Sequence, residues 1–136
     1  MVVKADIEVM NYIVTPKNIN EVFAKHSVPK ELDLLSIDID SYDLALWKAL
    51  SDEYQPRVVA IEMNPNFPMK TKATIRGNDE NWSWDNYSKF YGSSFGAMYE
   101  FAKSKGYTYV YNMAFTDIFF IRNDLVPEEL MNIDPL

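Results

Sequence analysis

The chain has 136 residues, a length that builds one hydrophobic core rather than two. Its net charge of -7 argues against general binding to nucleic acid or to anionic lipid, both of which require a cationic surface. The chain has no cysteine, which excludes disulfides, zinc–thiolate sites and cysteine nucleophiles, and its single histidine excludes a multi-histidine metal centre. We therefore expect a soluble, cytoplasmic protein without a nucleic-acid or membrane partner, since no signal peptide or membrane-spanning run is present.

Strands and helices are predicted to alternate in the first half of the chain. Dense runs of β-branched and apolar side chains indicate strands, and apolar residues three or four apart indicate helices. The expected elements are a strand at 7–14, a helix from Pro16 to about His26 with Thr15 as its N-cap, a strand at 33–39, a helix at 42–50 and a strand at 57–63.

The second half begins with a long segment, residues 64–91, that has no clear periodicity. A helix then begins at Ser93 or Ser94, which are good N-terminal capping residues, and ends before Gly106. The β-rich runs 107–113 and 116–122 are joined by so short a linker that they must form an antiparallel hairpin. A helical turn is expected in the tail, after Pro127.

This order predicts one α/β domain over residues 1–136, with a mostly parallel, Rossmann-like sheet and helices on both faces. Strands 33–39 and 57–63 should be parallel neighbours at its centre. The C-terminal hairpin should add an antiparallel strand, 116–122, beside 57–63.

Acidic residues gather where two predicted strands end. Asp38 and Asp40 follow the strand at 33–39, and the next strand ends in Glu62 and Asn64. Ligands of open α/β sheets bind beyond the carboxyl ends of the strands, and carboxylate and amide oxygens suit magnesium, calcium or manganese. The sequence therefore predicts a polar ligand site here, with Asp40, Glu62 and Asn64 as metal ligands. The alternative is that Asp40 or Ser41 only caps the following helix.

The segment 64–91 is rich in aromatic residues and asparagine. Irregular loops of this length often form lids or binding loops, and aromatic walls with amide groups suit a flat or sugar-like ligand. We expect Trp82 and Trp84 to contact a substrate, the alternative being that these rings cover an exposed edge of the core.

Three stretches carry a resemblance to a known family. LDLLSIDIDSYDLALWKAL, PRVVAIEMNPNFP and GYTYVYNMAFTDIFFIRNDL resemble the later strands of FkbM-like methyltransferases, over roughly residues 28–126. The resemblance implies a class I S-adenosylmethionine-dependent fold with an antiparallel strand inserted near the edge of its sheet. It also implies that Asp38 and Asp40 face the cofactor and the acceptor, and that Glu62 and Asn64 flank the acceptor pocket.

The chain departs from this family in its glycines. The fold binds its cofactor through a glycine-rich turn after the first strand, but the four glycines here lie at 77, 92, 96 and 106 and form no G-x-G. We expect the chain to correspond to the C-terminal portion of the fold, without competent S-adenosylmethionine binding of its own. Its partner would be a missing N-terminal half, or a second copy that joins it through the neighbourhood of 7–14.

Other functions also fit the motifs. A non-catalytic binding or assembly module would keep the scaffold without chemistry. Asp38 and Asp40 form a D-x-D pattern, as in metal-dependent glycosyltransferases that bind a nucleotide-sugar diphosphate. The same pattern supplies the nucleophile and acid of dehalogenase-type phosphatases, although there it normally lies on the first strand.

Overall fold

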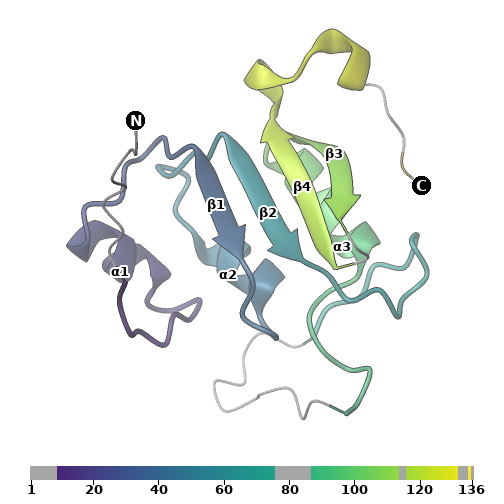
Figure 1. Cartoon of the computed structure of the whole chain (residues 1–136), viewed down its shortest axis with the longest axis horizontal. Helices are drawn as coiled ribbons and strands as arrows, with labels where there is room; N and C mark the ends of the chain where they lie inside the picture. Colours follow the sequence, from purple (N-terminus) through teal and green to yellow (C-terminus); the bar gives the residue numbers. More distant parts are fainter. Residues whose placement is uncertain (1–8, 76–86, 114–115, 132–134, 136) are drawn as a thin grey trace, which may run out of the picture.

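A computed structural model describes residues 9–75, 87–113, 116–131 and 135. This part of the chain forms an α/β structure with one four-stranded sheet (Figure 1). In chain order the helices and strands are α1 (Ile19–Lys25), β1 (Leu34–Ile37), α2 (Asp43–Ala49), β2 (Val58–Glu62), α3 (Phe95–Ser104), β3 (Tyr107–Met113) and β4 (Asp117–Arg122). Two 3-10 turns follow, Asn123–Leu125 and Glu128–Leu130, the second where a turn was predicted after Pro127.

The sheet has the strand order β1-β2-β4-β3. The pair β1 and β2 is parallel, with Leu34 opposite Val58, and β4 runs antiparallel to β2. Strand β3 forms the antiparallel hairpin with β4, with a register shift between Tyr109 and Tyr111. The predicted parallel pair, the hairpin and the insertion of β4 beside β2 are thus confirmed. The prediction that both parallel strands lie at the centre of the sheet is wrong for β1, which is an edge strand among the described residues because 9–14 form no strand beside it.

The sheet is mixed, whereas the sequence predicted a mostly parallel one. One of its three strand pairings is parallel and two are antiparallel. The difference arises partly at residues 9–14, which form no strand. Val9 and Ile13 are largely exposed, and the side-chain amide of Asn18 donates a hydrogen bond to the backbone carbonyl of Ile13. A β-rich composition is not sufficient without a partner strand to accept its hydrogen bonds.

One face of the sheet carries the core. Alternate residues of the strands, such as Ile61 and Phe120, are fully buried against α2 and α3. Trp47 of α2 packs against Phe120 at a ring-centroid distance of 5.6 Å, and Phe95 of α3 packs against Tyr109 at 5.3 Å. These aromatic contacts bind both helices to the same side of the sheet.

The opposite face of the sheet is open in the described residues. Figure 1 shows α2 and α3 behind the sheet and α1 beside the edge at β1. On the uncovered side, Leu34 is 54% exposed and Tyr111 60% exposed. The expected helices on both faces are therefore not found in this part of the chain. None of the described helices is long and apolar enough to span a bilayer.

Helix α3 begins and ends as its sequence indicates. Ser94 is its N-cap and accepts a hydrogen bond from the amide of Ala97, and Gly106 follows its C-cap with φ +81°. Gly96 is required because the backbone of the 69–71 segment crosses α3 there. A β-carbon at Gly96 would lie 2.6 Å from the carbonyl oxygen of Thr71.

Candidate functional site

The acidic residues at the carboxyl end of the parallel pair lie together. Asp38 and Asp40 follow β1, and Glu62 is the last residue of β2. Each offers a carboxylate oxygen, and the three oxygens lie within 4.8 Å of one another. We call these three residues the acidic triad. The predicted meeting of these side chains at one edge of the sheet is found in the structure.

A tight turn carries the triad from β1 into α2. Asp40 has a φ of +58°, the left-handed conformation that aspartate and asparagine adopt more readily than most residues. The fully buried carboxylate of Asp43 accepts hydrogen bonds from the amides of Ile39, at 2.8 Å, and Ser41, at 3.2 Å. Asp43 therefore fixes the turn on which Asp38 and Asp40 lie.

The helix-capping alternative for Asp40 and Ser41 is not what the structure shows. The N-cap of α2 is Tyr42, with no side-chain cap bond, and the Ser41 hydroxyl instead donates to the carbonyl of Ile39. Burial raises the pKa of Asp43 to about 6, although the bonds from backbone amides oppose this shift. Asp40 is exposed and its carboxylate lies with those of Asp38 and Glu62, so it is available to a ligand.

Glu62 is the most perturbed member of the triad. Its Oε2 atom is inaccessible to solvent and has no hydrogen-bond partner in the described structure. Burial, and then the charges of Asp43, Asp38, Asp40 and Asp117, raise its pKa to about 7. Every charged group that shifts this pKa is an acid, so an added cation or proton would relieve the repulsion.

Asp117 also lies near Glu62, although it was not among the site residues predicted from the sequence. It is the first residue of β4 and lies directly opposite Glu62 in the antiparallel register. Asp117 lies close to Glu62 because of that register. The predicted pairing of 116–122 with 57–63 was the signal that could have located it.

Asn64 is placed by the structure in a different role from metal ligation. Its buried amide nitrogen donates to the carbonyls of Lys89, at 2.8 Å, and Tyr91, at 2.9 Å. Its Oδ1 atom accepts from both the backbone and the side-chain nitrogen of Asn66, each at 2.9 Å. With both lone pairs in use, Asn64 clamps the two ends of the 64–91 segment together instead of offering an oxygen to a metal.

The aromatic segment reaches the triad through Tyr91. Burial raises the pKa of the Tyr91 hydroxyl, as do the nearby charges of Glu62 and Asp40. Tyr87 and Phe90 are 94% and 74% exposed and do not form a wall over the acids. Trp82 and Trp84, predicted to contact substrate, lie outside the described residues.

The surroundings do not fit S-adenosylmethionine. In the described structure β1 is an edge strand, so the strand and glycine-rich turn that would hold the cofactor have no counterpart beside it. Two of the three described glycines have other structural roles, since Gly96 lies in α3 against a backbone crossing and Gly106 follows the C-terminus of α3. Hard divalent cations fit better, because the triad offers carboxylate oxygens alone.

Comparison with protein-family models, with curated proteins and with solved structures found no match to this chain.

Proposed function

We propose that this chain is a divalent-cation-binding domain built on the later strands of a methyltransferase-like sheet, without methyl transfer of its own. The metal site is the acidic triad, Asp38, Asp40 and Glu62. Two carboxylates come from the turn after β1 and one from the end of β2, so a bound ion would join the carboxyl ends of both parallel strands.

The observation that carries this proposal is the environment of Glu62. An acceptor atom that is shielded from solvent and lacks a donor, such as Glu62 Oε2, is unfavourable. The negative charges of four aspartates, Asp38, Asp40, Asp43 and Asp117, add to this cost. A divalent cation satisfies the acceptor and offsets the repulsion in one step. The chain supplies no cysteine and one histidine, so the ligand set favours Mg²⁺ or Mn²⁺ over zinc.

The order of the strands supports the methyltransferase-like part of the proposal. A parallel pair followed by an antiparallel strand, inserted between that pair and its hairpin partner, is the arrangement that the FkbM resemblance implies. Because the cofactor does not fit, what this part of the fold retains is the polar end of the acceptor pocket.

A metal-dependent transferase that uses a nucleotide-sugar diphosphate is the second candidate. It is favoured by one observation, that both acids of the Asp38-Ile39-Asp40 pattern lie in the triad. In this case a nucleoside diphosphate would complete the coordination of the ion, and its presence would tighten metal binding.

The test is a titration with Mn²⁺, in which electron paramagnetic resonance measures the free ion. We expect saturable binding by the wild type and at least a tenfold loss of affinity in Asp40→Asn, whose asparagine tolerates the same left-handed backbone. The matched control is Asp33→Asn, an exposed acid at the other end of β1 that pairs with Arg57, and it should bind as the wild type does.

Three results would count against parts of the proposal. Equal Mn²⁺ binding by wild type and Asp40→Asn would remove the triad as the site. Calorimetry that detects micromolar binding of S-adenosylmethionine would refute the absence of cofactor binding. Metal affinity that increases when UDP is added would favour the nucleotide-sugar candidate.

A further inference from the structure

Strand β1 has a free edge. Among the described residues it pairs with β2 on one side and with no strand on the other (Figure 1). The amide of Val58 donates to the carbonyl of Asp33 at 3.0 Å, and Leu34 lies opposite Val58. In a parallel pair with this register, successive residues of β1 direct their N–H and C=O groups alternately to β2 and away from it. The backbone groups of Leu34 and Ser36 are therefore the ones that face away from the sheet.

Helix α1 leaves this edge accessible. It packs on the layer of helices behind the sheet, where the side-chain amide of Asn20 donates to the carbonyl of Ala49 at 2.8 Å. At the edge itself, Leu34 is 54% exposed and Ser36 is also exposed. An exposed apolar side chain beside unpaired backbone groups is the feature by which a strand edge attracts a further strand.

The two edges of the described sheet differ in their protection. Strand β3, at the other edge, has a register shift between Tyr109 and Tyr111, and irregularities of this kind hinder the addition of a further strand. The register of β1 is continuous from Leu34 to Ile37, and its sequence LLSI has no proline or lysine. The edge at β1 is therefore the one that a partner strand fits.

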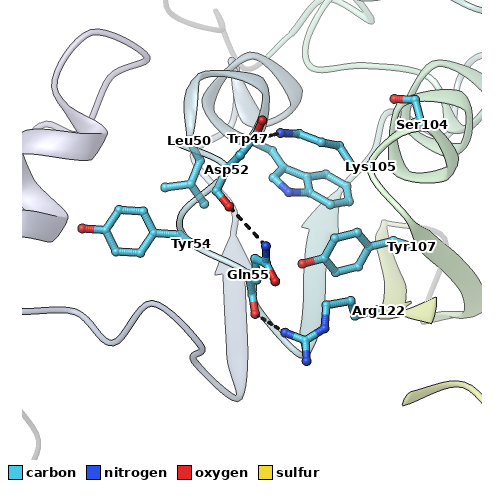
Figure 2. A pocket seen from close by; sticks show the side chains of 9 residues that line it. All are labelled: Trp47, Leu50, Asp52, Tyr54, Gln55, Ser104, Lys105, Tyr107 and Arg122. Carbon is cyan, nitrogen blue, oxygen red and sulfur yellow. Dashed lines mark hydrogen bonds and ion pairs between the residues drawn. The ribbon is translucent and has the colours of Figure 1, made fainter. Parts of the chain in front are cut away.

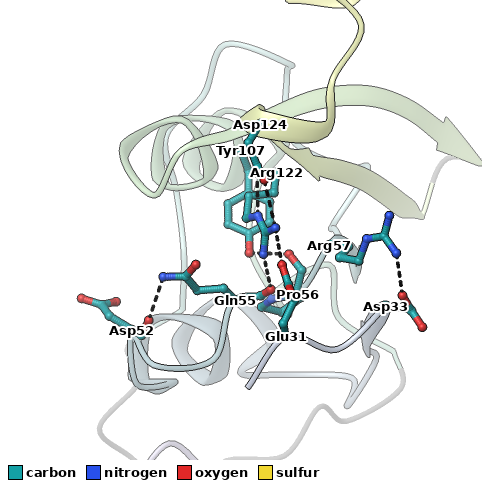
Figure 3. A network of polar contacts seen from close by, with 9 residues as sticks. All are labelled: Glu31, Asp33, Asp52, Gln55, Pro56, Arg57, Tyr107, Arg122 and Asp124. Carbon is teal, nitrogen blue, oxygen red and sulfur yellow. Dashed lines mark hydrogen bonds and ion pairs between the residues drawn. The ribbon is translucent and has the colours of Figure 1, made fainter. Parts of the chain in front are cut away.

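The segment before β1 is fixed along the same edge. The carbonyl of Lys30 accepts from the amide of Gln55 at 2.7 Å, and Figure 2 shows the carbonyl of Gln55 bound in turn by Arg122. Figure 3 shows that Arg122 also binds Glu31, on the same segment. These bonds continue the line of β1 back to Lys30, so its place relative to the strand is defined.

The free edge is complementary to a second copy of itself. The pairing is antiparallel about a two-fold axis, with Leu35 opposite Leu35 of the second copy. Leu34 then faces Ser36 of the second copy, and each such pair exchanges both of its N–H···O bonds, so every outward backbone group of these residues finds a partner. The two exposed Leu34 side chains become diagonal neighbours on the open face and cover each other.

The charges match in the same register. The acids of the segment come opposite residues 39, 37, 32 and 30 of the second copy, so that none of them faces another acid: Glu31, Asp33, Asp38 and Asp40. Asp40 comes opposite Lys30 of the second copy, whose side chain is 55% exposed while it pairs with Glu53. One such pair at each end of the contact offsets part of the repulsion between two chains that each carry a net charge of -7.

We propose that this chain forms a homodimer in which β1 pairs antiparallel with β1 of a second copy and joins the two sheets into one. The contact is small, so we expect reversible association with a dissociation constant on the order of 0.1 mM. The dimer does not depend on a bound metal, and it is tested in the presence of a chelator, which leaves Asp40 free to pair with Lys30.

Sedimentation equilibrium of the full chain, from about 10 μM to about 1 mM, measures the association. We expect the average mass to rise from that of one chain, 15.8 kDa, towards that of two. Amide hydrogen exchange at the two ends of this range locates the contact. The amides of Leu34 and Ser36 should exchange more slowly at the higher concentration, whereas those of Leu35 and Ile37, which face β2, should not change.

Matched pairs of exposed substitutions test the edge and the charges. Leu34→Lys should raise the dissociation constant about tenfold, because a lysine blocks strand addition, whereas Tyr111→Lys, at the other edge of the open face, should leave it unchanged. Lys30→Gln should raise it about threefold, whereas Lys103→Gln, which makes the same change of charge on α3, should not.

Three results would each overturn the proposal. The first is the mass of a single chain at about 1 mM. The second is an equal effect of the two variants within either matched pair. The third is slow exchange of the Leu34 and Ser36 amides that does not depend on concentration, which would mean that a segment of the same chain, such as residues 1–8, pairs with β1 instead.

Discussion

Replacing Glu62 with glutamine should change how the stability of this protein depends on pH. The carboxyl group of Glu62 has a pKa raised from 4.5 to about 7, chiefly by burial and then by Asp43, Asp38, Asp40 and Asp117. The folded state therefore binds more protons than the unfolded state between about pH 4.5 and 7. Its stability falls as pH rises through this window and is constant above it.

The magnitude follows from the two pKa values. Each pKa unit corresponds to about 1.4 kcal/mol, so the full difference would amount to about 3.4 kcal/mol. Glu62 is only partly buried, and solvent screening reduces this to about 1 to 2 kcal/mol. Glutamine has the shape of the protonated acid and does not ionise. Glu62→Gln should therefore match the wild type near pH 4.5 and exceed its stability by about 1 to 2 kcal/mol at pH 8.

Urea unfolding at pH 4.5, 6 and 8, in the presence of a chelator, measures this directly. Asp43 contributes a loss of stability of the same sign between about pH 4 and 6, because its pKa is also raised, but it does so in both proteins. Asp33→Asn is the control and should keep the pH dependence of the wild type. If Glu62→Gln and the wild type lose equal stability between pH 4.5 and 8, the carboxylate repulsion at the triad is not present.

Two further substitutions test how the chain around the triad is held. Gly96→Ala should lower the free energy of unfolding by about 1 to 3 kcal/mol, since its β-carbon would lie 2.6 and 2.9 Å from the carbonyl oxygens of Thr71 and Met69. Urea unfolding that shows a higher stability, as expected from the better helix propensity of alanine alone, would contradict this close approach. Asn64→Ala should cost about 2 kcal/mol of stability in the same assay, because it leaves the carbonyls of Lys89 and Tyr91 without their donor. Replacement of the exposed Asn66 by alanine should cost less, and equal losses would argue against Asn64 as the residue that clamps the 64–91 segment.

The sheet could be predicted where the sequence restricts its partners. The runs at 33–39 and 57–63 are apolar at nearly every position, and the hairpin linker is too short for anything but antiparallel pairing. The run at 7–14 has a similar composition, but residues 9–14 form no strand, and the carbonyl of Ile13 accepts a hydrogen bond from the Asn18 side chain instead of from a neighbouring strand. Composition alone does not distinguish these two cases.

The position of the candidate site could be predicted from the sequence. Asp40 and Glu62 were among the predicted metal ligands, whereas Asp38 was predicted to contact a cofactor and a substrate. Asp38, Asp40 and Glu62 follow from the rule that adjacent parallel strands bring their carboxyl ends together. Asn64 was assigned differently because an amide can serve either as a ligand or as a clamp, and only its bonds to Lys89, Tyr91 and Asn66 distinguish the two.

Other contributions required the three-dimensional arrangement. The turn-forming role of Asp43 depends on the left-handed backbone at Asp40, and the proximity of Asp117 depends on strand register.

If a divalent cation binds at the carboxyl ends of β1 and β2, paramagnetic broadening by Mn²⁺ locates the ion. Substoichiometric Mn²⁺ is added to the ¹⁵N-labelled protein, and the loss of each backbone amide signal is measured. We expect the amide signals of Asp38 to Asp43, Glu62 and Asp117 to disappear first, and we expect no such broadening in Asp40→Asn. Broadening centred on other acids, or none at concentrations of Mn²⁺ near one equivalent, would contradict it.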